Sequence, residues 1–372
     1  MAIDRRSLLL GVAASAVATS VPLPAVSADA RALYAAARKG ADGRYSAAVF
    51  TADGIDVNAV ALPGRGHDIT VSAASGDCVV FARRPGNFAV AFTADKSRAP
   101  VRFTTPPDRH FYGHGIFSPD GRLLYATEND FEGARGMIGI YDVAAGYRRI
   151  GEFGSGGIGP HDLALIDGGR VLVIANGGLI EHPDIGGGRR ILNPGAIETT
   201  LAYVDVRTGA LLERHDLGAA GALSLRHLDV ARDGTVIIGA QLTSNASGMQ
   251  PLVYRHRRQS PLAKIALPPV IERDLSGYIS SVACDSAGEF AAVTSSRGAL
   301  AMIIDVATGE VRHTRRLEDI SGVAPTPAAA AFLTTTGTGR VAQTSVGADG
   351  DAAPTPWAWD NHAVLVGEHA PG

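Results

Sequence analysis

The chain has 372 residues, of which 46% are hydrophobic and 19% are charged, and its formal net charge is −3. This balance supports a large apolar core and provides no basic field for nucleic acid, so a nucleic-acid partner is not expected. The two cysteines, Cys78 and Cys284, are too few for a disulfide framework or a thiolate metal site.

The first residues have the pattern of an export signal. The pair Arg5-Arg6 precedes a moderately apolar run, and Val26-Ser27-Ala28 forms a small-residue cleavage site. An arginine pair at this place fits the twin-arginine type of signal, and the alternative is a general secretory signal with an incidental arginine pair. We predict a twin-arginine signal peptide over residues 1–28, a periplasmic protein, and a mature chain over residues 29–372 that does not insert into a membrane.

Beyond this leader, the chain repeats a unit of four short apolar strands separated by glycine-rich turns. In one clear copy the strands are expected over residues 113–118, 122–127, 137–142 and 147–153. A unit of this size is typical of one propeller blade. The repeats start near residues 67, 114, 161, 227, 281, 322 and 362.

The two ends of the mature chain supply one blade between them. Residues 32–36, 45–50 and 57–62 have the pattern of a second, third and fourth strand, and residues 360–365 have that of a first strand with nothing after it. Joining them in one sheet closes the ring and removes a free strand edge. The predicted fold is therefore all-β, a single seven-bladed β-propeller closed by the N-terminal strands plus the C-terminal strand, and a monomer is expected.

Histidine recurs at the start of the innermost strand in five of the seven repeats. These residues are His67, His114, His161, His227 and His362. Because this strand lines the central channel of a propeller, we expect the five imidazoles to converge at the channel mouth. Neutral imidazole is a common ligand of first-row metals, so the sequence predicts a site for iron, or for copper or zinc.

Other polar side chains are expected on the same face of the ring. They come from the ends of second strands and from a long insertion in the third repeat, residues 177–200, of a length that is usually functional or mobile. The secondary candidates are Glu128, Asn129, Asn176, Glu181, His182 and Gln241. Asp68 and Asp162, which each follow a histidine, are candidates for orienting an imidazole, or simply cap turns.

Two other interpretations stay open. In many propellers a Gly-His pair at the entry to a blade bonds to a turn or an aspartate of the same blade. The histidines would then be a fold signature, and the protein a scaffold for partner proteins. The third hypothesis is a propeller enzyme, either a lactonase or a metal-dependent oxidoreductase. A lactonase needs a carboxylate-dominated calcium site, which an imidazole ring does not match, and no spacing indicates a catalytic acid–base pair.

Several segments resemble one bacterial family. They are residues 113–118, 159–163, 175–179 and 225–228, and the closing Trp359-Asp360-Asn361-His362. With the Arg-Arg leader, they resemble the family known as domain of unknown function fifteen-thirteen, over nearly all of the mature chain. The stretch from residue 197 to 200 departs from the family's pattern in the long insertion.

That resemblance implies a periplasmic propeller of the WD40-like or YVTN kind, encoded beside imelysin-like iron-regulated proteins and dihaem-peroxidase-like proteins. It implies no catalytic residues. Its motif positions match Asn176 and the five repeated histidines, in undefined roles. Together with the residue pattern, it favours a non-enzymatic accessory component of iron acquisition, which binds a metal ion or a metal-bearing partner at the histidine-lined mouth.

Overall fold

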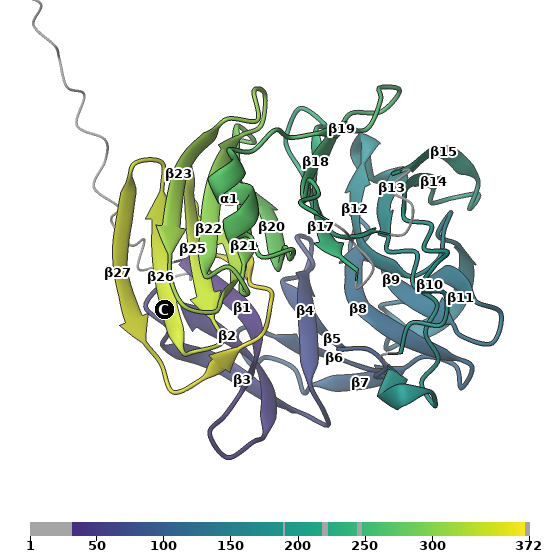
Figure 1. The fold of residues 1–372 in the computed structure, drawn as a ribbon. Coiled ribbons are helices and arrows are strands. Elements are labelled where there is room, and N and C mark those ends of the chain that lie inside the picture. The colour runs from purple at the N-terminus through teal and green to yellow at the C-terminus, as the bar shows by residue number, and fades with distance from the viewer. Residues whose placement is uncertain (1–31, 189, 218–221, 244–247, 369–372) are drawn as a thin grey trace, which may run out of the picture.

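The structure is a computed structural model that describes residues 32–188, 190–217, 222–243 and 248–368. Within these residues, six sheets of four strands and one sheet of five form a seven-bladed β-propeller (Figure 1). The predicted fold class is therefore confirmed, whereas the predicted leader lies outside the described residues. Among the described residues, no helix has the length and apolar character needed to span a membrane.

The first three blades that follow one another in the chain are regular four-stranded antiparallel sheets. The first is β4 (Gly66–Val71), β5 (Asp77–Ala82), β6 (Phe88–Thr93) and β7 (Val101–Thr104). The second is β8 (Arg109–Phe117), β9 (Leu123–Asp130), β10 (Arg135–Asp142) and β11 (Arg148–Gly154). The third is β12 (Pro160–Ile166), β13 (Val171–Asn176), β14 (Thr200–Asp205) and β15 (Leu211–Asp216).

The next three blades repeat this order. The fourth is β16 (Leu223–Val230), β17 (Val236–Leu242), β18 (Val253–His256) and β19 (Ala263–Lys264), and the short helix α1 (Pro269–Asp274) follows it. The fifth is β20 (Ser281–Cys284), β21 (Phe290–Ser295), β22 (Leu300–Asp305) and β23 (Val311–Arg316). The sixth is β24 (Ile320–Pro325), β25 (Ala331–Thr336), β26 (Arg340–Ser345) and β27 (Ala348–Pro354).

The seventh blade is built from both ends of the chain, as predicted. The C-terminal strand β29 (Val364–Glu368) pairs with β1 (Ala32–Lys39), which continues into β2 (Tyr45–Thr51) and β3 (Asp56–Leu62). A short strand, β28 (Ala358–Trp359), also pairs with β1. The purple N-terminal strands therefore lie against the yellow C-terminal part of the chain in Figure 1.

The closing strand starts later than predicted. The sequence pattern indicated a strand over residues 360–365, but β29 begins at Val364 and His362 lies in the gap after β28. The Asp360 carboxylate accepts a hydrogen bond from the backbone N–H of Asn361, while its own N–H donates to Ala37 of β1. These contacts end one strand and leave His362 outside a regular ladder.

Burial explains the two kinds of strand pattern. Second strands such as β5 and β13 are buried along their whole length, because neighbouring blades cover both faces, and they are nearly continuous apolar runs. Outermost strands such as β11 and β15 alternate between exposed and half-buried residues. The core therefore lies between the blades, and it holds the innermost strands in a closed circle.

A recurrent D-V-x-x-G motif makes the turn from the third to the fourth strand. In the third blade, the Asp205 carboxylate accepts hydrogen bonds from the backbone N–H groups of Arg207 and Thr208. Gly209 then takes a left-handed backbone with φ of 69°, which glycine adopts without steric cost. The motif occurs in the second, third and fifth blades, where it joins these two strands without using residues of the central channel.

Candidate functional site

The four histidines that lie within innermost strands occur where strand pairing is irregular. The register of β4 against β5 shifts between Gly66 and Ile69, across His67, and the other three strands shift likewise across His114, His161 and His227. A β-bulge bends its strand and re-aims a side chain. The irregular pairing therefore allows these side chains to leave the normal alternation of the sheet.

Glycine makes room where the strands approach one another. Gly113 has φ of 111°, and a Cβ atom added to it would lie 2.5 Å from Cδ2 of His67. Gly322, which replaces histidine in the sixth blade, has the backbone of His362 and Ala363 at 3.2 Å from such a Cβ. The glycines before and between the histidines are therefore required by close packing around the axis.

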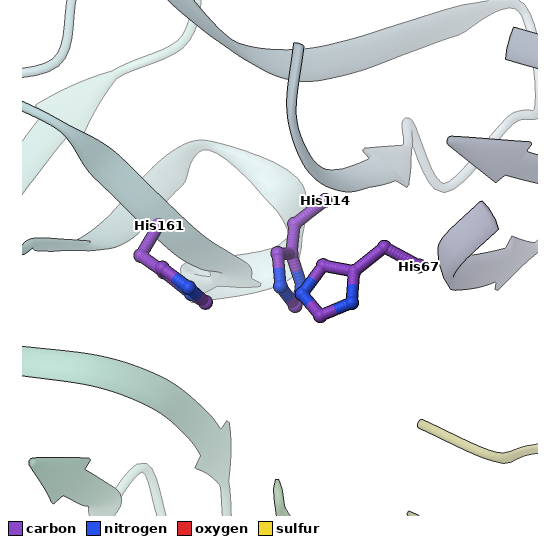
Figure 2. A group of neighbouring side chains, drawn as sticks. All are labelled: His67, His114 and His161. Atoms are coloured by element: carbon purple, nitrogen blue, oxygen red, sulfur yellow. The ribbon is translucent and has the colours of Figure 1, made fainter. Parts of the chain in front are cut away.

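The five histidines converge, as the repeat spacing predicted. In nine of the ten pairs the ring centroids are 4.6–6.5 Å apart, with the shortest distance between His227 and His362 and the longest between His67 and His227. Figure 2 shows three of them, His67, His114 and His161, with their rings grouped together. We call these five residues the histidine cluster; all five are buried, with at most 7% of any residue exposed.

Carboxylates from neighbouring blades orient the cluster. Nδ1 of His114, in the second blade, lies 3.3 Å from a carboxylate oxygen of Asp68 in the first blade and 3.3 Å from one of Asp162 in the third. Nδ1 of His67 lies 3.1 Å from Oδ1 of Asp360, which precedes the closing strand. A carboxylate on one ring nitrogen fixes the imidazole and leaves the other nitrogen for a ligand.

A hydroxyl group plays the same part at the last histidine. Nδ1 of His362 lies 3.1 Å from Oγ of Ser281, the residue that replaces histidine in the fifth blade. Consequently Nδ1 is engaged in His67, His114 and His362, and Nε2 is the remaining ring nitrogen.

Four ring nitrogens in the cluster are buried without a hydrogen-bond partner among the described residues. They are Nε2 of His114, Nε2 of His362, Nδ1 of His161 and Nδ1 of His227. Buried polar atoms are normally paired, and each unpaired one costs about 1–3 kcal/mol. Among the described residues, the cluster therefore presents convergent lone pairs or N–H groups without a hydrogen-bond partner, although a carboxylate oxygen of Asp162 lies 3.9 Å from Nδ1 of His227.

Electrostatics separates His114 from the other four. Burial disfavours its charged form, but the carboxylates of Asp162 and Asp68 outweigh that effect and raise the pKa of His114 to about 10. Burial, with the neighbouring His114 as a further cause, lowers the pKa of His362 to about 4. Burial also lowers the pKa of the remaining three, His67, His161 and His227. With no metal bound, these shifts favour four neutral imidazoles and one imidazolium at neutral pH, and a metal bound at Nε2 of His114 would displace the proton from that nitrogen.

The candidate ligand atoms are close enough to share an ion. One ring nitrogen from each of His67, His114 and His161 lies within 4.8 Å of the other two, and the same holds for His114, His227 and His362. Nitrogens that each lie about 2 Å from a metal are at most about 4 Å apart, so small ring rotations bring either set into range. His114 belongs to both sets.

A third group of possible ligands, Glu213, His215 and His256, lies on the outer strands β15 and β18 of the third and fourth blades. There the nitrogens of His256 are already used, since Nε2 is 2.8 Å from the Ser260 carbonyl oxygen and Nδ1 is 2.5 Å from the Tyr203 hydroxyl. His215 Nε2 is 2.6 Å from the Glu213 carboxylate. These contacts make it a satisfied network.

The secondary candidates have their contacts away from the histidine cluster. Glu128 is buried inside the second blade, where it accepts a hydrogen bond from the Tyr141 hydroxyl at 2.6 Å and pairs with Arg149. Asn176 is hydrogen-bonded to Ser155 and Thr200 between the second and third blades. In a strand, alternate residues face opposite sides, so a place near the strand end did not bring these side chains to the axis.

The remaining secondary candidates border the insertion, residues 177–200, or the fourth blade. Asn129 donates hydrogen bonds to Nε2 of His110 and to the carbonyl of Glu181. The Glu181 carboxylate pairs with Arg84 at 2.6 Å, and His182 lies 3.4 Å from Glu132. Gln241 is in β17, bridged through its backbone to Tyr278. These contacts attach the insertion to the first and second blades.

Sequence reasoning missed two groups that orient the cluster. Asp360 belongs to the closing motif and precedes the last histidine by two residues, and Ser281 stands where the fifth blade has no histidine, but neither is among the candidate residues. Asp68 was a candidate, but it serves His114 of the next blade rather than its own neighbour His67. Contacts between blades have no signal in the local sequence.

The fold and the cluster define a class of protein: a seven-bladed β-propeller with buried histidines gathered at its innermost strands. The chain belongs to the DUF1513 family, described as a protein of unknown function, whose sequence model matches residues 60–366. No curated protein matches the chain.

Similar solved structures support the fold. A chain of Kuenenia stuttgartiensis hydrazine synthase has a TM-score of 0.61 and 14% identity, covering 83% of this chain and 94% of that chain. A chain of a mitotic checkpoint complex has a TM-score of 0.58 and 14% identity, covering 79% of this chain and 80% of that one. At this level of identity the likeness shows the propeller fold alone.

Proposed function

We propose that the protein binds a transition-metal ion in the histidine cluster and acts as a periplasmic accessory component of iron acquisition. The observation that carries the proposal is the convergence of five buried imidazoles. Three of the five are held through Nδ1, and four ring nitrogens of the cluster have no hydrogen-bond partner among the described residues. A bound ion would satisfy such nitrogens in one step.

The alternative of a fold signature fits the contacts less well. That hypothesis expects each imidazole to bond to a turn or an aspartate of its own blade. Here the carboxylates beside His67 and His114 come from adjacent blades, and both carboxylates beside His114 would act as outer partners of a metal ligand. The arrangement favours a site assembled by the whole ring.

The donor set narrows the choice of metal. Imidazole nitrogen suits iron, copper and zinc, whereas calcium and magnesium prefer oxygen ligands. Iron is the metal that we propose, because of the implied association with iron-uptake proteins, and copper and zinc are the chemical competitors. Because the cluster is buried, a free ion fits it better than a metal-bearing protein; imelysin-like or dihaem-peroxidase-like partners would bind at the rim.

The test is metal analysis of protein exported by its native host. We expect about one iron, copper or zinc ion per chain, held by the three or more imidazoles that such metals commonly take. The double variant His114→Ala/His161→Ala should lose the ion. The matched control His110→Gln, which changes another buried histidine of β8 outside the cluster, should keep it.

Two results would overturn the proposal. One is metal-free wild-type protein from the native host, and the other is unchanged metal content in a folded double variant. If metal-free protein still captured its partners after the double change, the scaffold hypothesis would replace this one. Circular dichroism of both variants distinguishes loss of metal from loss of fold.

A further inference from the structure

A polar pocket of about 440 Å³ lies beside the histidine cluster. Its walls come from the ends of β1 and β4 and from the segments around β28, β20 and β24, and they include Asp360, the partner of His67. Five cationic side chains line it: Arg38, Lys39, Arg65, Arg83 and Arg297. Among the described residues, only two carboxylates, those of Asp319 and Asp360, line it as well, although the whole chain carries a net charge of −3.

Internal ion pairs balance only part of this positive charge. Arg38 is paired with Asp56 and lies 3.6 Å from the centre of the Trp357 ring, so its role is structural. Arg65 and Arg83 share the single carboxylate of Asp360, at 2.6 Å and 3.3 Å.

That carboxylate is also the one that holds Nδ1 of His67, 3.1 Å from the same Oδ1. One negative charge therefore faces two guanidinium groups and an imidazole. The lining keeps a surplus of positive charge, because its five cationic side chains outnumber its two carboxylates together with the Asp56 carboxylate that pairs with Arg38.

Two further cations are exposed at the rim. Lys39 lies 5.8 Å from the Tyr45 ring, and Arg297 lies 4.7 Å from the Tyr278 ring. With the described residues, neither forms an ion pair with a carboxylate. Their aromatic contacts position the charges while leaving their N–H groups for a ligand.

Neutral donors complete the lining. The Tyr278 hydroxyl accepts a hydrogen bond from the Asn361 side-chain amide at 2.7 Å, so its own hydrogen is available. The Ser296 hydroxyl lies 3.0 Å from the Ser280 hydroxyl, which donates to it. Tyr278 and Ser296 both line the pocket. A cavity of this size lined by cations and hydroxyl donors suits a small, highly charged ligand rather than an apolar one.

We infer that this pocket binds a small oxyanion with two or more negative charges, of the carboxylate or phosphate class. The inference does not depend on the proposed metal. Guanidinium groups bind both kinds of oxyanion through paired N–H donors, and lysine adds a point charge. Asp319 on the wall restricts the ligand to one whose charge outweighs this carboxylate.

The chain offers an internal reporter for this pocket. Its only two tryptophans by sequence are Trp357 and Trp359; the first stacks on Arg38 and the second lines the pocket. Full-length protein is stripped of metal with a chelator, and the chelator is then removed. Sodium phosphate or sodium citrate is titrated in at constant ionic strength, with tryptophan fluorescence and calorimetry as readouts.

We expect saturable binding that weakens as salt rises. Tighter binding of phosphate would identify the phosphate class, and tighter binding of citrate the carboxylate class. The variant Lys39→Gln/Arg297→Gln should weaken binding about tenfold or more, equivalent to about 1.4 kcal/mol. The matched control is Arg102→Gln, which removes an exposed arginine of β7 that lies 5.9 Å from the Phe88 ring. This variant should change the affinity less than twofold.

The inference is overturned if neither anion binds saturably, or if Arg102→Gln weakens binding as much as the double variant. Since the protein is metal-free throughout, a negative result here leaves the metal proposal standing. Anion binding by metal-free wild-type protein would support the oxyanion site and would not bear on the metal proposal.

Discussion

Buried histidines in this protein differ in the groups that face them. His114 lies between two carboxylates, which raise its pKa and favour the imidazolium while no metal is bound, whereas His110, four residues earlier in β8, faces a carbonyl and an amide. In His110, Nδ1 donates to the Phe111 carbonyl and Nε2 accepts from the Asn129 amide, which requires the neutral ring. Burial lowers the pKa of His110 to about 4.

This shift predicts acid sensitivity. Between pH 6.5 and 4 the unfolded chain binds a proton at His110 that the folded chain does not, so the free energy of unfolding falls as pH falls. At pH 5 the loss from this residue is about 2 kcal/mol. His110→Gln keeps a donor and an acceptor at the same place, so it should lose about 2 kcal/mol less than wild type between pH 7.5 and pH 5.

Urea unfolding of metal-free protein at the two pH values measures this difference. The cluster histidines contribute equally to both proteins and cancel in the comparison. An identical pH dependence in the variant and the wild type would show that His110 does not carry this effect.

At the scale of a strand, the bulged segment of β8 places the backbone of Gly113 against the imidazole ring of His67. Gly113 combines a φ of 111° with the closest approach to His67, whereas Gly146, in a turn of the same blade, has φ of 69° and open space around it. The two glycines separate the cost of the backbone angle from the cost of the contact.

We therefore expect Gly113→Ala to lower the free energy of unfolding by about 2 kcal/mol or more, and Gly146→Ala by about 1 kcal/mol. Only the first should also reduce the metal content, since the added methyl group displaces the His67 ring. Thermal unfolding and elemental analysis of both variants measure these effects. If both variants were destabilised equally and both kept their metal content, glycine would be needed at position 113 only for its backbone angle.

Single strands show which parts of the fold could be predicted from the sequence and which could not. Strands with continuous apolar runs or clear turns, such as β9 or β13, could be located because burial and turn chemistry are local. The side of the sheet that the Glu128 side chain faces could not be predicted from the local sequence, because it depends on the pairing of β9 with β10. The outer strands of the fourth blade have no clear pattern, because β19 spans only Ala263–Lys264.

At the scale of the whole molecule, closure of the ring assembles the cluster. The seventh blade brings His362 from the C-terminus beside His67 and His114, with ring centroids 4.7 Å and 4.8 Å apart. The repeat spacing predicted this convergence, because a ring places equivalent positions around one axis. The spacing could not predict that carboxylates of one blade contact histidines of the next blade, because these contacts depend on how neighbouring sheets pack.

Crystallography of protein purified from its native host, with diffraction data collected at the iron, copper and zinc absorption edges, shows whether the histidine cluster binds a metal. We expect one anomalous peak inside the cluster, about 2.0–2.2 Å from imidazole nitrogens of at least three of the five histidines. A cluster without an anomalous peak, with its ring nitrogens bonded to ordered water instead, would contradict this expectation.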